Sequence, residues 1–292
     1  MTVEFNQSLM GIPTEWYVPV AKAAEAAGFG HLALSDHVFY PKDLQSKYPY
    51  SPDGTPQYDP AWDFPDPWVT MAAIAAVTER ITMHTSVFIA PLREPVLLAK
   101  QLGSLARLSD NRVRLGVGVG WMREEFDVVG ESFTNRGRRM DEMFEVLRAI
   151  WKGGFVEFHG EFYDFPAIEM RPAPSKPVPI WIGGHSELAL RRAARNDGWV
   201  GAQYRVGEIE QHAASIRAYR EELGVADEPY DMVVSALALP TPDKLERLDA
   251  AGVTALTTSA WIAQGVMTPE SLEHALDLVG SYGEQWITPT QG

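Results

Sequence analysis

The sequence of 292 residues contains no cysteine. This absence excludes disulfide bonds, a thiolate nucleophile and any metal site or iron–sulfur cluster that cysteine would ligate. Positive charge is also scarce, because 25 Lys and Arg residues stand against 39 Asp and Glu residues and the net charge is −14. A broad basic surface that grips nucleic acid is therefore excluded, although one small anion could still bind at a local site.

Long apolar runs are missing as well. No stretch reaches the roughly 18 consecutive apolar residues that a membrane span requires. The first residues, MTVEFNQSLMG, lack the basic and apolar parts of a secretory signal. We therefore expect a cytoplasmic protein that does not enter a membrane. Hydrophobic residues make up 46% and charged residues 22% of the chain, which is the composition of a globular protein with a sizeable core.

Short apolar runs alternate with longer amphipathic ones through almost the whole chain, which is typical of parallel strands joined by helices. The eight expected strands are residues 3–9, 31–34, 81–88, 112–119, 179–182, 198–202, 231–238 and 253–258. The expected helices are residues 14–27, 67–79, 95–108, 136–151, 186–195, 207–223, 242–251 and 269–283. This α/β pattern predicts a (β/α)8 TIM barrel that forms one domain over residues 1–292, with a doubly wound open sheet as the alternative.

Two insertions interrupt the repeat. Residues 155–165 alternate about a His-Gly turn and predict a β-hairpin before the fifth strand. The second insertion is the connection from Val38 to Pro67, which holds seven of the 21 prolines in 30 residues. It also carries seven aromatic residues, namely Phe39, Tyr40, Tyr48, Tyr50, Tyr58, Trp62 and Phe64. Connections of this length are usually lids or binding loops, and aromatic faces suit a flat or apolar ligand; a surface loop or dimer contact is the alternative.

Chemistry in a barrel of this kind lies at the carboxyl ends of the strands. Ser35, Asp36 and His37 follow the second strand, where charged groups are costly unless they are paired or used. They indicate either a site or an Asp–His pair that caps a neighbouring loop. A hydrolytic triad is disfavoured because successive side chains on a strand face opposite ways, and the remaining histidines show no spacing of metal ligands, so we expect no metal.

The fourth expected strand ends in RLGVGVGW, with Gly116, Gly118 and Gly120 at alternate positions. The spacing does not match the G-x-G-x-x-G fingerprint of dinucleotide-binding folds. Glycine at a strand end indicates that something approaches the backbone closely. The approaching group is either a cofactor or another part of the barrel.

The fifth expected strand ends in Gly183 and Gly184, directly before a helix that begins near Ser186. Backbone N–H groups at such a helix start predict a phosphate site, and an ordinary Ser N-cap is the alternative. The arginines expected to add local positive charge on this helix are Arg191, Arg192 and Arg195. GHSEL lacks the second glycine of a G-x-S-x-G hydrolase turn, which argues against a hydrolase.

Taken together, these segments resemble the luciferase-like monooxygenase superfamily and, within it, the class of probable coenzyme F420-dependent oxidoreductases. The resemblance rests on SDH at 35–37, the block from Thr85 to Phe126, the RGRRMDE stretch and WIGGHSELALRRAA, and it covers nearly the whole chain. It implies a (β/α)8 barrel whose mouth binds coenzyme F420, or FMN as the alternative. It also implies a small-molecule substrate and a homodimer.

The resemblance also implies roles for single residues. The family carries a cis peptide that is not prolyl behind the cofactor ring, and the matching bond here is Ser86–Val87. His37 matches a candidate acid or base beside the ring, and Asp36 is expected to orient it or stabilise its charge. The residues matched or expected to contact the cofactor are Ser86, Val87, Gly118, Gly120, Gly183, Gly184, His185 and Ser186.

One departure from the family pattern concerns the substrate. In the branch that oxidises sugar phosphates a glutamate follows the strand-four glycines, whereas Trp121 stands here. Together with Tyr40 and Trp62, this residue is expected to line a pocket for a less polar substrate. The expected reaction is hydride transfer between the deazaflavin C5 and that substrate. An FMN-dependent monooxygenase and a flavin-binding barrel without turnover are the alternatives.

Overall fold

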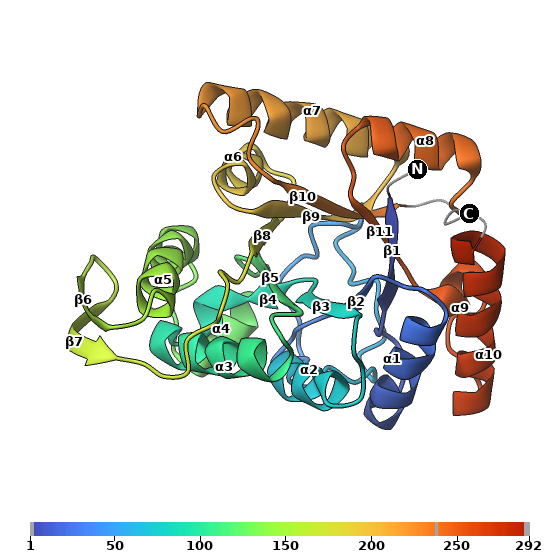
Figure 1. The fold of residues 1–292 in the computed structure, drawn as a ribbon, viewed down its shortest axis with the longest axis horizontal. Helices are drawn as coiled ribbons and strands as arrows, with labels where there is room; N and C mark the ends of the chain where they lie inside the picture. Colours follow the sequence, from blue (N-terminus) through green and yellow to red (C-terminus); the bar gives the residue numbers. More distant parts are fainter. Residues whose placement is uncertain (1–2, 237–238, 289–292) are drawn as a thin grey trace.

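The computed structural model describes residues 3–236 and 239–288, which form a closed parallel barrel wrapped by helices (Figure 1). The strands of the barrel are β1 (Glu4–Ser8), β2 (His31–Leu34), β3 (Thr82–Thr85), β4 (Phe88–Ile89), β5 (Val113–Gly118), β8 (Ile180–Gly183), β9 (Gly198–Tyr204), β10 (Asp231–Ala236) and β11 (Ala255–Thr258). The sheet runs in the order β3-β2-β1-β11-β10-β9-β8-β5-β4, and β3 also pairs with β5. That pairing closes the sheet, so the predicted barrel is confirmed and the open sheet is wrong.

β3 and β4 are the two halves of the third expected strand, and together they occupy one of the eight positions around the barrel. The break between them falls at Ser86 and Val87, whose peptide bond is cis, as the resemblance implies. The last two residues of the strand expected at 231–238 lie outside the described residues.

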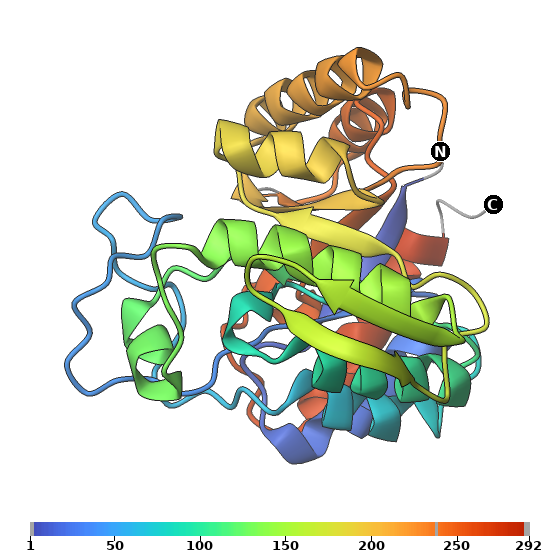
Figure 2. The same ribbon diagram turned by 90° about the vertical axis from the view of Figure 1, so that its left-hand side faces the viewer.

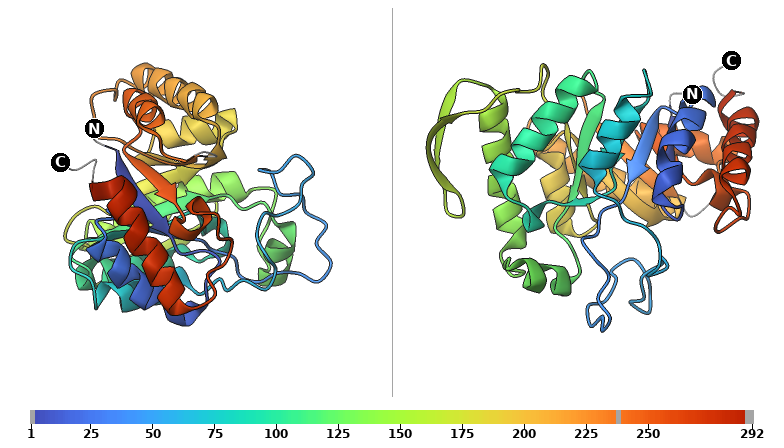
Figure 3. Two further views of the ribbon diagram at one scale, coloured as in Figure 1. Left: turned by 90° about the vertical axis from the view of Figure 1, so that its right-hand side faces the viewer. Right: turned by 90° about the horizontal axis from the view of Figure 1, so that it is seen from below.

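The outer helices pack against one another and around the barrel (Figures 1 and 3). They are α1 (Tyr17–Ala26), α2 (Pro67–Ala75), α3 (Pro95–Leu108), α4 (Arg123–Val129), α5 (Arg136–Trp151), α6 (Glu187–Ala194), α7 (Val206–Glu222), α8 (Pro242–Ala250), α9 (Ala260–Ala263) and α10 (Leu272–Tyr282). The predicted helices all form, some with shorter ends. Nothing in the sequence pattern predicts α4 or α9, because seven and four residues are too few to show a helical period.

The hairpin predicted outside the barrel is confirmed. It consists of β6 (Phe155–His159) and β7 (Asp164–Glu169), which pair antiparallel beside α5 (Figure 2). Its turn is held by Glu142 of α5, whose carboxylate accepts hydrogen bonds from the backbone N–H groups of residues 161–163 at 2.8 to 2.9 Å.

The glycines of β5 make room for the end of β3. A Cβ atom at Gly116 would lie 1.9 Å from the carbonyl oxygen of Thr85, and the Thr85 hydroxyl donates to the Gly116 carbonyl at 2.6 Å. A Cβ atom at Gly118 would lie 2.7 Å from the Val87 side chain. These two glycines are therefore required by the packing of the barrel itself, and contact between Gly118 and a cofactor stays a prediction.

We expect Gly116→Ala to destabilise the protein by about 3 kcal/mol, because the new methyl group overlaps a backbone oxygen that the barrel holds in place. Gly207→Ala is the matched control, since Gly207 lies in α7 and a Cβ atom there meets nothing within 4 Å. The control is expected to stay within about 1 kcal/mol of the parent. Urea unfolding measures both, and equal stabilities for the two variants would contradict the packing argument.

Candidate active site

The long connection after β2 lies beside α4 at one end of the barrel (Figures 2 and 3). Two neighbouring glutamates in the first turn of α4 hold it there. The Glu124 carboxylate accepts hydrogen bonds from the backbone N–H groups of Gln45 and Ser46 at 2.7 and 3.0 Å, and from the Ser46 hydroxyl at 2.7 Å. Burial opposes ionisation of Glu124, but these hydrogen bonds outweigh it and lower the pKa of the carboxyl group to about 2. The loop is thus fastened in its middle by a carboxylate that is ionised at neutral pH.

His37 lies at the start of this connection, with both ring nitrogens in contact with other side chains. Its Nδ1 lies 3.2 Å from Oε1 of Glu125, and its Nε2 lies 3.3 Å from the Tyr58 hydroxyl. The rings of Phe64 and Trp121 stand nearly perpendicular to the imidazole, with centroids 5.3 and 5.9 Å away. The imidazole is therefore enclosed by aromatic rings and bonded on both sides.

Asp36 makes different contacts from those expected. Its Oδ1 pairs with Arg93 at 2.6 Å, and its Oδ2 accepts a hydrogen bond from the Ile89 N–H at 2.9 Å. Burial raises the pKa of this carboxyl group, while the Arg93 guanidinium opposes the shift. Both oxygens thus bind the segment that follows the cis peptide, and the carboxylate that contacts the His37 ring is Glu125.

Glu125 is the residue that sequence reasoning missed. Its side chain is fully buried, and Oε1 also accepts a hydrogen bond from the Val38 N–H at 2.7 Å. It is buried because the next residue, Phe126, packs against Ile89 and Leu92 and turns this face of α4 toward the barrel. No clear signal marked it, because the two acidic residues of MREEF stand in a segment too short to show a helical period.

Aromatic residues of the loop form a cavity beside His37. The cavity has a volume of about 140 Å³ and is lined by His37, Val38, Phe39, Tyr40, Tyr58, Pro60, Trp62 and Phe64. The structure therefore brings Tyr40 and Trp62 together with His37, as expected. Trp121 is not among the lining residues, but its ring contacts both the imidazole and the ring of Tyr48.

The loop also reaches the start of α6. The ring of Tyr50 contacts those of His185 and Tyr204, with centroids 5.3 and 6.4 Å away, and burial raises the pKa of Tyr50 to about 12. His185 in turn lies 3.1 Å from the Tyr204 hydroxyl through Nδ1. The aromatic loop thus spans from His37 to the predicted phosphate site.

The predicted phosphate site has the backbone geometry that the sequence suggested. Gly184 adopts φ +104°, and Ser186 is the N-cap of α6, where its hydroxyl accepts a hydrogen bond from the Ala189 N–H at 3.2 Å. A Cβ atom at Gly183 would meet the Val87 side chain at 2.9 Å, so this strand end lies directly beside the cis peptide. The Ser N-cap is confirmed, and phosphate binding stays a prediction.

The arginines of α6 do not supply the positive charge expected for this site. Arg191 and Arg192 lie in the last turn of the helix, away from its start. Arg191 pairs with Glu187 at 2.9 Å and with Glu222 at 3.4 Å, and Arg192 pairs with Asp141 at 2.5 Å. Arg195 is the C-cap residue of the same helix. Because the two paired arginines neutralise nearby carboxylates, any anion at the helix start would depend on backbone N–H groups.

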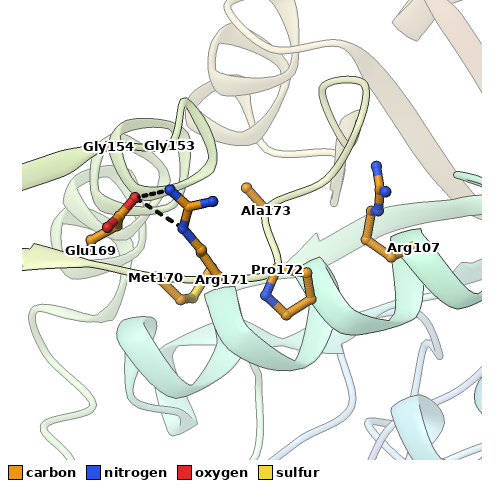
Figure 4. A pocket seen from close by; sticks show the side chains of 8 residues that line it. All are labelled: Arg107, Gly153, Gly154, Glu169, Met170, Arg171, Pro172 and Ala173. Atoms are coloured by element: carbon orange, nitrogen blue, oxygen red, sulfur yellow. Dashed lines mark hydrogen bonds and ion pairs between the residues drawn. The ribbon is translucent and has the colours of Figure 1, made fainter.

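A larger cavity of about 550 Å³ lies elsewhere (Figure 4). It is lined by Arg107, Gly153, Gly154, Glu169, Met170, Arg171, Pro172 and Ala173. These residues follow or end α3, α5 and β7, so the cavity is at the face where the barrel strands begin. Although it is larger, this cavity is not the candidate active site, because catalytic residues of such barrels lie at the opposite face.

Residues 3–236 and 239–288 contain no group of three or more His, Asp or Glu side chains that could hold a metal ion. None of the helices in the same residues has the length and apolar character that crossing a membrane requires.

Comparison with known proteins gives a consistent result. A family model described as luciferase-like monooxygenase matches residues 10–283. An uncharacterized protein of Mycobacterium tuberculosis is 44% identical over 239 residues, which cover 82% of this chain and 83% of that protein. An F420-dependent glucose-6-phosphate dehydrogenase of Tsukamurella paurometabola is 31% identical over 189 residues, covering 63% of this chain and 52% of that enzyme.

A solved structure supports the fold. It is an F420-dependent secondary alcohol dehydrogenase in complex with an F420–acetone adduct, and it superposes with a TM-score of 0.75 over 97% of this chain and 98% of its own. The two sequences are 15% identical, so this likeness concerns the fold alone.

Proposed function

Because the chain belongs to the luciferase-like monooxygenase family, we propose that it is an oxidoreductase that uses coenzyme F420 to exchange a hydride with a small organic substrate. The observation that carries the proposal is His37, which is held at the barrel mouth with Nδ1 on a buried carboxylate and which lines an aromatic cavity. A group that holds or releases a proton thus lies where a substrate could reach it.

The residues at the mouth fit a flavin-type cofactor. Ser86 and Val87 are half-buried although the residues on either side are buried, so the cis peptide lies where the barrel meets the mouth. Gly183 and Gly184 are half-buried as well and lead into the start of α6, whose first N–H groups suit a phosphate. These four residues would hold the ring and the phosphate.

When bound, the deazaflavin supplies or accepts the hydride. For a substrate oxidised at a carbon that bears a hydroxyl group, the hydroxyl proton passes to Nε2 of His37 as the carbon–hydrogen bond breaks and a carbonyl forms. In the reverse direction the protonated imidazole returns this proton to the carbonyl oxygen. The Tyr58 hydroxyl, which lies at Nε2, occupies the position that the substrate oxygen would take or share.

The lining of the cavity favours a weakly polar substrate. Aromatic side chains and Pro60 dominate it, and none of its eight lining residues is Lys or Arg. Trp121, which stands where a glutamate serves the sugar-phosphate branch, lies against the imidazole. A phosphorylated or carboxylated substrate would find no cation in this lining, so we expect a small neutral molecule.

An FMN-dependent monooxygenase is the second candidate, and the description of the matching family favours it. Titration of the purified protein with F420 and with FMN, followed by absorbance and fluorescence, separates the two. We expect F420 to bind at least tenfold more tightly than FMN, which corresponds to about 1.4 kcal/mol. Tighter binding of FMN, with oxygen consumption by the reduced complex, would overturn the F420 proposal.

If His37 exchanges the proton, its removal should lower turnover without weakening the binding of the cofactor. His37→Ala removes the imidazole that exchanges the proton, so kcat is expected to fall at least a hundredfold while the Kd of the cofactor changes less than threefold. Steady-state kinetics with a panel of small alcohols and carbonyl compounds measures the first, and titration measures the second. Unchanged turnover with the cofactor bound would show that His37 is not the acid or base.

A negative charge placed at the start of α6 tests the proposed phosphate site. Ser186→Asp preserves a good N-cap but adds a negative charge at the start of α6, so the Kd of F420 is expected to rise at least tenfold. Ser271→Asp is the matched control, because Ser271 caps α10 in the same way through the His274 N–H at 3.1 Å. If both variants bind F420 like the parent, the phosphate lies elsewhere.

A further inference from the structure

We propose that Glu125 is the positioning residue that fixes which nitrogen of His37 carries its proton, and that it thereby leaves Nε2 unprotonated, as the nitrogen that accepts the proton of the substrate. The expected effect on turnover rests on the proposed function. The contacts among Glu125, His37 and Tyr58 do not depend on it.

The contacts of the imidazole show which ring nitrogen donates a hydrogen bond and which accepts one. Oε1 of Glu125 lies 3.2 Å from Nδ1, and the same oxygen accepts the Val38 N–H at 2.7 Å. An ionised carboxylate accepts hydrogen bonds and donates none. Nδ1 must therefore carry the hydrogen, and in the neutral ring Nε2 is then an acceptor. The Tyr58 hydroxyl, 3.3 Å from Nε2, completes the arrangement by donating to it.

Burial strengthens the interaction between the Glu125 carboxylate and the His37 ring. The side chain of Glu125 is fully buried and that of His37 is 11% exposed, so little water separates the two groups. Oε2 of Glu125 has no hydrogen-bond partner among the described residues, and its charge is therefore compensated chiefly through Oε1. In these surroundings little water competes with the Glu125 carboxylate for the Nδ1 hydrogen.

The other charged groups near the ring do not compete for Nδ1. Asp36 precedes His37 in the chain, but Arg93 and the Ile89 N–H occupy its two oxygens. Tyr58 faces Nε2, and burial together with the charge of Glu125 raises the pKa of its hydroxyl, so that it stays protonated at neutral pH. Glu125 is thus the carboxylate in a position to set the state of the ring.

Glu125→Gln tests the proposal, because glutamine keeps an oxygen for the Val38 N–H and loses the charge. The first measurement uses protein labelled with ¹⁵N at histidine, without cofactor, and a two-bond ¹H–¹⁵N correlation spectrum that reports the tautomer of each of the seven imidazoles. The His37→Ala spectrum identifies the signal. We expect the Nδ1–H form in the parent and a mixture with the Nε2–H form in Glu125→Gln.

The second measurement is kinetic. In Glu125→Gln we expect kcat to fall at least tenfold, while the Kd of F420 changes less than twofold, because the carboxylate acts through His37. Glu124→Gln is the matched control for the tautomer, since it makes the same chemical change at the neighbouring residue, which binds Ser46. It should leave the His37 signal in the parental form.

The outcomes separate this inference from the proposed function. An unchanged His37 tautomer in Glu125→Gln would overturn the positioning role, even if the enzyme uses F420 as proposed. A changed tautomer in a protein that binds no F420 would keep the positioning role and overturn the function. A changed tautomer with full kcat would show that Glu125 sets the ring state without serving the reaction, which also overturns the proposal.

Discussion

The barrel closes where β3 meets β5, and the rest of the structure depends on how closely the two strands approach. The Thr85 carbonyl occupies the space in which Gly116 lacks a side chain, and Val87 fills the corresponding space at Gly118 and Gly183. The Val87 side chain, which follows the cis peptide bond, thus lies against the ends of both β5 and β8. Barrel closure and the shape of the proposed cofactor site have the same physical origin.

The first turn of α4 connects this rigid barrel to the aromatic loop. Glu124 holds the middle of the loop through Gln45 and Ser46, and Glu125 holds its beginning through Val38. Because Glu125 also contacts the His37 ring, the position of the loop and the state of the imidazole are set by adjacent residues of one short helix. A change that moves α4 would therefore move both the wall of the cavity and its histidine.

The proposed phosphate site at the start of α6 has little side-chain positive charge. The chain has a net charge of −14, and two of the arginines expected to bind an anion form ion pairs with carboxylates of α5, α6 and α7 instead. The start of α6 retains backbone N–H groups, a positive-φ glycine and a Ser N-cap. A phosphate there would be bound by main-chain dipoles rather than by side-chain cations.

The sequence alone determined the order of strands and helices, since apolar periodicity is a local property; the bounds of β2, α3 and α5 agree with it residue for residue. It also placed His37 and the two glycine-rich strand ends at the mouth, because parallel strands end on one face. Tertiary structure decided which carboxylate contacts His37. Asp36 is adjacent in the chain but bonds to Arg93, whereas Glu125 is 88 residues away and is brought in by a helix of seven residues. Neighbours of this kind depend on packing between distant segments, which no local pattern in the sequence encodes.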